Sequence, residues 1–274
     1  MVEITETAQR ISAEDMSKRL NLDLPDDEIG RLASTFDAML ARLEAAFRRE
    51  QQLTADVSHE LRTPLGLLKA QLSLARTKPR DAETLVSMMV AMEGDVDRLT
   101  HIVEQTLLLS QVEQQGIAEP EPLFLDDVLL AALERLRPIA QARGVESRLE
   151  ITPQIDWQTS GDTQLLEQAF ANLLQNAITH TPAGGVVTLS AQRLWHGFTV
   201  RVADTGPGIS PEHLPHLFER YYRVDDSRTR ETGGFGLGLT ITDSIVRAHG
   251  GAISVDSTTG AGTTFIVTLP AAPH

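Results

Sequence analysis

Apolar residues in the first half of the chain recur at helical spacing. Phe36, Leu40, Leu43 and Phe47 step by four, three and four residues. A longer series continues the alternation over three heptads: Leu85, Met89, Met92, Val96, Leu99, Val103 and Thr106. This spacing places apolar side chains on one face of a helix. The pattern predicts two long helices, roughly 40–76 and 82–115, separated by the short polar segment 77–81.

The two predicted helices are expected to fold back as an antiparallel hairpin. A single hairpin would leave much of its apolar seam exposed, so we expect two chains to form a dimeric four-helix bundle. The alternative is a monomeric hairpin that packs on the second half of the chain. Upstream, residues 4–11 predict a further helix and residues 21–27 a connector, an arrangement that suits the transmission of a movement.

The second half of the chain predicts helices interleaved with strands. After the Pro-containing segment 116–122, a helix capped by Asp126 is expected to run to about Arg143, and another is expected over 162–180. Short β-branched or alternating runs follow at Val186–Ala191, Phe198–Ala203, Ala252–Val255 and Thr263–Leu269. The interleaving predicts a two-layer α/β sandwich with a largely antiparallel sheet.

Charge and composition narrow the partners and the chemistry. The 274 residues include 24 Lys and Arg against 38 Asp and Glu, a formal net charge of −14, which argues against nucleic acid or anionic lipid as a partner. Cys is absent, which excludes disulfides, thiolate metal sites and cysteine nucleophiles. No segment reaches the roughly 18 to 20 consecutive apolar residues of a membrane span, so we expect this chain to be soluble.

Candidate chemistry in the first half centres on His59. Val57, Leu61 and Leu65 are spaced to share one helix face, and His59 lies about 200 degrees from Val57, toward solvent. A neutral imidazole is a usable nucleophile near physiological pH. Taken alone, an exposed His beside a Glu is most often only a surface pair.

The neighbours of His59 fit such a role. The carboxylate of Glu60 is placed to fix the ring tautomer and to accept the ring proton. Thr63, one turn further on, is placed to hold a water or a phosphoryl oxygen near the ring. Pro64 removes a helix hydrogen bond, so a bend or local loosening is expected beside the His.

Asn172 and Asn176 lie one turn apart beside the apolar face of the helix predicted at 162–180. Amide oxygens suit Mg²⁺, which keeps waters and nucleotide phosphates as its other ligands. The alternative is that either Asn hydrogen-bonds a neighbouring loop or the sheet.

Two glycine-containing segments follow predicted strands. In Asp204-Thr-Gly-Pro-Gly208 the carboxylate is suited to accept a hydrogen bond from an exocyclic amine, and the glycines let a flat ring approach the backbone, although a simple turn would use the same residues. In 233–239 the glycines are suited to expose backbone amides to phosphates where a helix begins. The long segment 210–232 between them is of the kind that serves as a lid.

The order of these motifs resembles that of bacterial two-component sensor histidine kinases. An H-box at 59–64 is followed by an N-box at 172–180, a glycine box at 204–208, an F-box at 218–223 and a second glycine box at 234–238. Residues 260–265 resemble the closing strand motif of the family. Residues 27–30 resemble part of a HAMP relay module.

The resemblance implies a multi-domain α and α+β protein. Residues 1–49 would form a HAMP module with a truncated first helix. Residues 50–118 would form the helical hairpin of a dimeric four-helix bundle for dimerisation and histidine phosphotransfer. Residues 119–274 would form an α/β sandwich ATP-binding domain with a mixed, largely antiparallel sheet.

The resemblance also implies residue roles. His59 would be the phosphoacceptor, Glu60 its general base, and Thr63 the residue used in dephosphorylating the partner. Asn176 would bind Mg²⁺ with Asn172 supporting the phosphates. The other implied ATP-binding residues are Asp204, which would read the adenine amine, and His180, Gly206, Gly208, Ile209, Phe218, Gly234, Gly236, Leu237, Gly238 and Thr264.

Some residues depart from the family pattern. Thr179 stands where many members carry a basic residue near the phosphates, and His180 where Tyr is common. Phe235 replaces a small polar residue between the lid glycines. Arg220 and Arg223 are placed either to supply positive charge to the lid or to form surface salt bridges.

By this resemblance the protein is an ATP-dependent protein-histidine kinase. It would be a homodimer that passes its phosphoryl group to an Asp in a response regulator receiver domain and also dephosphorylates that regulator. Full-length relatives lie on the cytoplasmic side of the membrane, which this chain would contact only through transmembrane segments it lacks. The alternatives are a clamp-moving ATPase like those of chaperones, gyrase and mismatch repair, a degenerate kinase acting as a scaffold, and a phosphatase-biased enzyme.

Overall fold

The computed structural model describes residues 28–77, 80–117, 119–152, 155–224 and 236–271. The chain divides after Met88 into two compact units. Most of the expected HAMP module, residues 1–27, lies outside the described residues, as do Gly234 and Phe235. No described helix is both long enough and apolar enough to cross a membrane.

The first unit is dominated by one helix, α2, which runs from Glu28 to Thr77 and continues through Pro64. It begins earlier than the predicted residue 40. Between 57 and 75, its less exposed positions are Val57, Leu61, Pro64, Leu68, Gln71 and Ala75. Leu65, expected on this face, is 53% exposed. At about 100 degrees per residue Pro64 lies only about 20 degrees from Val57, whereas Leu65 lies about 80 degrees away.

Helix α3 runs from Ala82 to Gln115, as predicted, and most of it belongs to the second unit. The carboxylate of Asp81 accepts the N–H of Thr84 at its start. Its buried residues are Ile102, Gln105, Leu109 and Val112. Three residues of the predicted seam, Met89, Val96 and Val103, are 65%, 50% and 43% exposed in the single chain. The helix carries a second apolar stripe, displaced from the buried one.

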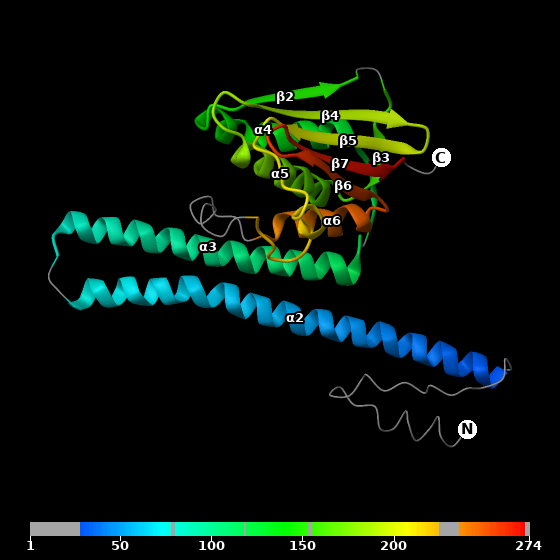
Figure 1. The fold of residues 1–274 in the computed structure, drawn as a ribbon, viewed down its shortest axis with the longest axis horizontal. Helices are drawn as coiled ribbons and strands as arrows, with labels where there is room; N and C mark the ends of the chain where they lie inside the picture. Colours follow the sequence, from blue (N-terminus) through cyan, green and yellow to red (C-terminus); the bar gives the residue numbers. More distant parts are fainter. Residues whose placement is uncertain (1–27, 78–79, 118, 153–154, 225–235, 272–274) are drawn as a thin grey trace. The chain divides into compact units, whose positions relative to one another are not determined.

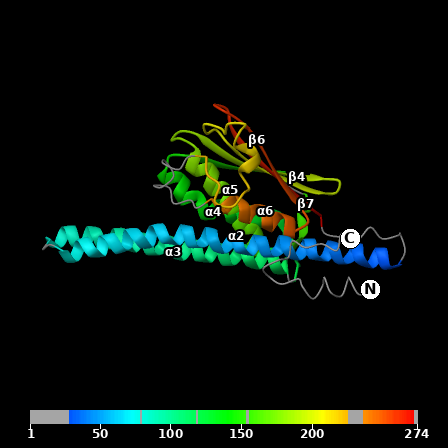
Figure 2. The same ribbon diagram turned by 60° about the horizontal axis from the view of Figure 1, so that its bottom comes forward.

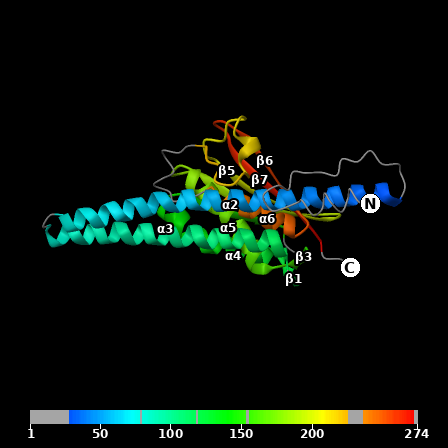
Figure 3. The same cartoon turned by 90° about the horizontal axis from the view of Figure 1, so that it is seen from below.

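The second unit contains a five-stranded sheet in the order β2-β4-β5-β7-β6 (Figure 1). Its strands are β2 (Glu146–Ile151), β4 (Val186–Leu194), β5 (Gly197–Asp204), β6 (Ala252–Thr258) and β7 (Gly262–Pro270). β2 and β4 pair in parallel and the other neighbours are antiparallel, so the expected mixed, largely antiparallel sheet is confirmed. The short strands β1 (Glu121–Phe124) and β3 (Gln158–Gly161) form a separate antiparallel pair (Figure 3).

Three helices cover one face of this sheet: α4 (Leu125–Ala142), α5 (Thr163–His180) and α6 (Gly238–Ala248) (Figures 1 and 2). The predicted cap of α4 is wrong. The N-cap residue is Phe124, without a side-chain hydrogen bond, and Asp126 lies inside the first turn, where its charge favours the helix dipole. The cap of α5 is Asp162, whose side chain accepts the N–H groups of Gln164 and Leu165.

The core lies between these helices and the sheet. Alternate residues of the central strands are buried against the apolar faces of α4, α5 and α6: Val187, Leu189 and Ala191, Phe198, Val200 and Val202, and Phe265, Val267 and Leu269. Trp157 is also buried and stacks on Phe198 with ring centroids 5.5 Å apart. Trp195, in the turn between β4 and β5, is 94% exposed. The packed layers fix where the ends of α5, β5 and α6 lie.

Candidate functional site

A pocket of about 570 Å³ opens in the second unit where the end of α5 faces the segment after β5. Arg143, at the end of α4, completes its wall. The lining residues are Arg143, Thr179, His180, Thr181, Pro182, Ala183, Thr205, Gly206 and Pro207. The sequence predicted two of them, His180 and Gly206, as ATP-binding residues.

Asp204 is the last residue of β5 and directly precedes this wall. Its Oδ1 accepts the backbone N–H of Gly206 at 2.8 Å and that of Thr263 at 3.3 Å. In the described part of the chain Oδ2 accepts no hydrogen bond. Burial raises the pKa of Asp204, and the two backbone hydrogen bonds oppose that rise. The site therefore offers an oriented acceptor to a ligand.

His180 closes α5 and lines the same pocket. Desolvation lowers the pKa of His180, and the Asp204 carboxylate acts in the opposite direction. The guanidinium of Arg143 also disfavours its protonation, and Arg143 donates to the backbone oxygen of Thr179 at 3.0 Å. Desolvation and Arg143 thus favour the neutral imidazole, which offers a ring face and a hydrogen-bonding nitrogen rather than a charge.

The residue of β7 that lies beside Asp204 is Thr263, not Thr264. Asp204 and Thr263 are register partners, whereas Thr264 is paired with Ala203. Successive side chains of a strand point to opposite faces, so Thr264 lies on the face away from Asp204. The register therefore favours Thr263 over the predicted Thr264 as the threonine beside Asp204. Only the register between β5 and β7 distinguishes two consecutive threonines, and the sequence alone does not give it.

A hydrogen-bond network buttresses this corner. Ser257 Oγ lies 3.0 Å from Thr263 Oγ1 and accepts the backbone N–H of Ile209 at 2.8 Å. Ile209, a predicted ATP-binding residue, is therefore fixed through its backbone. Ser257 was missed by sequence reasoning because an isolated Ser in a strand gives no distinctive signal.

The glycines after Asp204 are required by close packing. Gly208 has φ of +70°, and a Cβ there would lie 2.1 Å from the oxygen of Thr258. A Cβ at Gly206 would lie 2.8 Å from Oδ1 of Asp204 and 3.0 Å from the oxygen of His180. These glycines let β5, β6 and α5 converge at the pocket.

The two Asn residues of α5 differ in their contacts. The Asn172 amide donates to the oxygen of Gly238 at 3.3 Å, and its own oxygen accepts from Gln168 at 2.9 Å. Asn172 thus links α5 to the start of α6, which is neither the loop nor the sheet that its structural alternative named. Among the described residues the Asn176 side chain makes no hydrogen bond, and it is half-buried. Its amide oxygen is therefore the one suited to a ligand.

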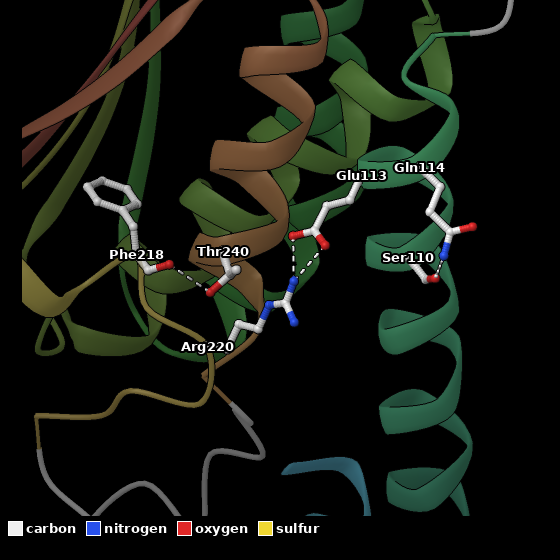
Figure 4. A network of polar contacts seen from close by, with 6 residues as sticks. All are labelled: Ser110, Glu113, Gln114, Phe218, Arg220 and Thr240. Atoms are coloured by element: carbon white, nitrogen blue, oxygen red, sulfur yellow. Dashed lines mark hydrogen bonds and ion pairs between the residues drawn. The ribbon is translucent and has the colours of Figure 1, made fainter. Parts of the chain in front are cut away.

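The start of α6 is held by the segment 218–222. Gly236 has φ of +72° and its oxygen accepts the N–H of Tyr221 at 3.1 Å. Thr240 donates to the oxygen of Phe218 at 3.1 Å (Figure 4). Leu237 is buried and precedes the first helical residue, Gly238. The N-terminal amides of α6 thus adjoin Asn172, an arrangement suited to phosphate binding.

The arginines of this segment were given two roles by the sequence. Arg220 takes the salt-bridge role, because it pairs with Glu113 of α3 (Figure 4). No described hydrogen bond or ion pair involves Arg223, and its Nη2 is buried.

The remaining predicted residues belong to the first unit. His59 and Glu60 lie within α2, although their side chains are not among those described, and Thr63 is exposed on the same helix. Of the predicted nucleotide-binding residues, the second unit brings His180 and Gly206 to one pocket, with Asp204 next to it, whereas His59, Glu60 and Thr63 lie in the first unit. Among the described residues no group of three or more His, Asp or Glu is suited to hold a metal ion.

Three family models match the chain. "Histidine kinase-, DNA gyrase B-, and HSP90-like ATPase" matches residues 161–273, "His Kinase A (phospho-acceptor) domain" matches 49–115, and "HAMP domain" matches 1–45. The first match contains every residue that lines the pocket except Arg143. The second contains His59.

Individual proteins agree with these matches. The chain is 36% identical over 269 residues to the sensor histidine kinase CusS of Escherichia coli K12, covering 98% of this chain and 55% of CusS. It thus spans about half the length of that relative. The structure of full-length ShkA in complex with AMPPNP has a TM-score of 0.59 at 29% identity, covering 81% of this chain and 47% of ShkA. The histidine kinase ThkA in complex with the response regulator TrrA has a TM-score of 0.66 at 23% identity, covering 84% and 66%, and shares the fold.

Proposed function

The chain belongs to the two-component sensor histidine kinases, and on this premise we propose that it uses ATP to phosphorylate its own His59. The observation that carries the nucleotide half of the proposal is Asp204. It is a half-buried carboxylate next to a pocket, with one oxygen held by two backbone amides and the other without a hydrogen-bond partner in the described protein. The match of residues 49–115 to a phospho-acceptor domain supports His59 as the target.

Each end of the nucleotide has a proposed partner. Asp204 accepts the adenine amine, the backbone at Gly206 and Gly208 faces the ring, and Thr263 supports the carboxylate. At the other end, the amides at the start of α6 bind phosphate, close to Asn172. The AMPPNP bound by the related ShkA is consistent with an adenine nucleotide as ligand.

Mg²⁺ fits the oxygen of Asn176. This oxygen makes no hydrogen bond in the described protein, and Mg²⁺ accepts one or two protein oxygens beside phosphates and waters. When bound, the ion neutralises charge on the phosphates. Asn172 has its oxygen committed to Gln168, so we assign it to holding α6 in place.

The proposed transfer is an in-line displacement at phosphorus. A ring nitrogen of His59 forms a bond to the γ-phosphorus while the bond from that phosphorus to the bridging oxygen breaks and ADP leaves. Glu60 accepts the proton from the other ring nitrogen. The phosphoramidate then passes its phosphoryl group to an Asp carboxylate of a receiver domain. The solved complex of ThkA with the response regulator TrrA supports this class of partner.

We further propose that two copies of the chain form the functional dimer. The second apolar stripe of α3 is exposed over its length, at Val86, Met89, Val90, Val96, Val103 and Leu107. Exposed apolar residues repeated along a long helix are suited to cover another helix. Domain limits of 1–49, 50–118 and 119–274 are part of the same proposal.

The HAMP match at residues 1–45 supports a further proposal, that the full-length protein is a membrane sensor with this part on the cytoplasmic side. Fractionation of cells that express the full-length protein checks it. Recovery in the membrane fraction is expected, and recovery in the cytosol alone contradicts it.

The first experiment incubates the purified chain with γ-labelled ATP and Mg²⁺. Label that is stable in alkali and lost in acid is expected, because phosphohistidine has that stability. The variant His59→Ala should lose the label and still bind nucleotide, and His101→Ala, on α3, is the matched control that should keep it. Full labelling of His59→Ala would overturn the assignment. An unlabelled wild-type chain that binds and hydrolyses ATP would favour the ATPase alternative.

A further inference from the structure

The segment that holds the start of α6 is also joined to α3 by an ion pair (Figure 4). Arg220 Nη2 lies 2.7 Å from Oε1 and 2.6 Å from Oε2 of Glu113. The side chains are 16% and 35% exposed, and 107 positions separate them in the sequence. Three other ion pairs join neighbours along one element, and in each at least one side chain is more exposed than Arg220 or Glu113. They are Glu134–Arg137, Glu146–Arg148 and Asp243–Arg247. The Arg220–Glu113 pair is thus a long-range contact with substantial shielding from water.

On one side the pair is coupled to the proposed phosphate site. Phe218 and Tyr221, which flank Arg220, are hydrogen-bonded to Thr240 and Gly236. A Cβ on Gly236 would lie 2.6 Å from the carbonyl carbon of Tyr221, so the two backbones touch. A rearrangement at the start of α6 therefore has to move the backbone that carries Arg220.

On the other side the pair lies next to a connection. Glu113 is in the last turn of α3, which ends at Gln115, and β1 begins at Glu121. Residues 116–120 are the whole connection between α3 and the sandwich. Gly116 has φ of +61°, the left-handed conformation that ends many helices. An ionic contact across so short a connection restricts how the sandwich turns about the end of α3.

We propose that Arg220 and Glu113 form a latch that holds the ATP-binding fold at the end of α3, and that the latch opens when phosphates bind at the start of α6. The inference rests on the proposed kinase function. Both are positioning residues, since neither contacts the reacting atoms. The closed latch restrains the fold, and its opening frees the fold to carry the γ-phosphoryl group to His59.

Cross-linking tests the contact without any need for phosphoryl transfer. The chain has no Cys, so the double variant Glu113→Cys/Arg220→Cys carries only the two introduced thiols. A short bismaleimide should join them within one chain, seen as a shifted monomer on a denaturing gel. A non-hydrolysable ATP analogue with Mg²⁺ should lower the yield several-fold. The control is Glu104→Cys/Arg220→Cys, in which the α3 position lies about 13 Å nearer the start of that helix than Glu113 does.

Two cross-linking results would contradict the proposal. A yield no higher than that of the control would overturn the latch. An equal yield with and without the nucleotide analogue would overturn its coupling to phosphate binding.

Kinetics test its role. Glu113→Gln should tighten ATP binding several-fold and raise the initial rate of autophosphorylation at subsaturating ATP, because a nucleotide that opens the latch binds better when the latch is absent. Exchange of the charges in Glu113→Arg/Arg220→Glu should return the rate toward wild type. Arg137→Gln, which removes an exposed pair on α4, is the control with unchanged rate. A lowered or unchanged rate in Glu113→Gln, or no rescue by the exchange, would overturn the latch. If the wild-type chain takes up no label, the proposed kinase function is refuted. The cross-linking experiment still tests the contact between Arg220 and Glu113 in that case.

Discussion

His249 Nε2 accepts the backbone N–H of Asp162 at 3.0 Å, so the end of α6 holds the residue that caps α5. The other ring nitrogen lies 2.8 Å from the oxygen of Ile245, to which it donates. This fixes a neutral tautomer, because a protonated ring would turn a second N–H toward the N–H of Asp162. The helix that carries Asn172 and Asn176 is thus anchored by an uncharged imidazole.

Stability of the second unit should therefore depend on pH through His249. Burial lowers the pKa of His249 in the folded state, so the unfolded chain binds its proton more readily. The contribution of His249 to the free energy of unfolding is complete above about pH 6.5 and is lost as pH falls from there through the folded pKa. Denaturant unfolding of the full chain at a series of pH values from about 5 to about 8 measures this contribution.

The variant His249→Leu should remove this part of the pH dependence. It should also lower the free energy of unfolding at pH 8 by about 1–3 kcal/mol, because the N–H of Asp162 loses its acceptor. His196→Ala, in the exposed turn between β4 and β5, is the matched control. Parallel pH profiles for wild type and His249→Leu would refute the prediction.

Asp204→Ala should weaken ATP binding roughly ten- to a hundredfold, since a hydrogen bond to a charged group contributes about 1.5–3 kcal/mol. Calorimetric titration with ATP measures the change. The wild type should bind ATP better than the purine triphosphate that lacks the amine, and Asp204→Ala should bind both alike. Asp256→Ala, exposed on β6, is the control that should keep wild-type affinity. Preserved discrimination in Asp204→Ala would show that another group reads the amine.

Adjacent threonines of β7 should respond differently to the same change. Thr263→Val removes the hydroxyl that contacts Ser257 beside Asp204 and should weaken ATP binding several-fold. Thr264→Val, on the other face of the sheet, should leave binding within about twofold, since an isolated surface substitution changes the free energy by about 0.5 kcal/mol or less. Titration with ATP gives the Kd of each variant. A larger loss of affinity in Thr264→Val than in Thr263→Val would favour Thr264 as the threonine at the nucleotide.

The exposed stripe of α3 should be the dimer contact. Val96→Glu places a charge on that stripe and should shift the chain toward monomer in sedimentation measurements, because an unpaired charge in a helix interface is costly. The control is Asp97→Lys, which changes the charge of an exposed residue next to Val96 on α3. A Val96→Glu chain that stays dimeric at low micromolar concentration would place the contact elsewhere.

Thr63→Ala should separate two activities. Thr63 is exposed one turn after His59, where its hydroxyl is suited to hold a water for attack on a phosphorylated receiver domain. The variant should still autophosphorylate and should lose most of its dephosphorylation of that partner. Thr100→Ala, an exposed threonine of α3, is the control. Equal loss of both activities would mean that Thr63 supports the helix rather than the water.

Local patterns in the sequence predicted the elements that have strong local signals. The 4-3 repeat predicted α3, whose limits came from the polar segment 77–81 and the segment 116–122, and β-branched alternation located β4 to β7. β2 and β3 were missed because ESRLEI and QTSG are rich in charged or polar residues, and pairing with β4 and β1 determines that they are strands. Propensity is weak where tertiary pairing decides.

The site shows the same limit. Asp204, Gly206 and Gly208 were predicted as nucleotide-binding residues because a carboxylate followed by spaced glycines is a local pattern. Thr264 was predicted from a motif, whereas placing Thr263 beside Asp204 needs the strand register. Arg143 and Glu113 had no local signal, since each gains its role only from a partner far along the chain.

The two tryptophans make the two units separately observable. Both belong to the second unit, one buried against Phe198 and the other almost fully in water. In Trp195→Phe the only indole is that of Trp157, and its emission moves to longer wavelength when the core between the helices and the sheet opens. The long helix α2 contains no Trp and does not contribute to this fluorescence, but it contributes strongly to the circular dichroism of the chain. Two optical probes on one sample thus record whether the helical unit and the nucleotide unit melt together or one after the other.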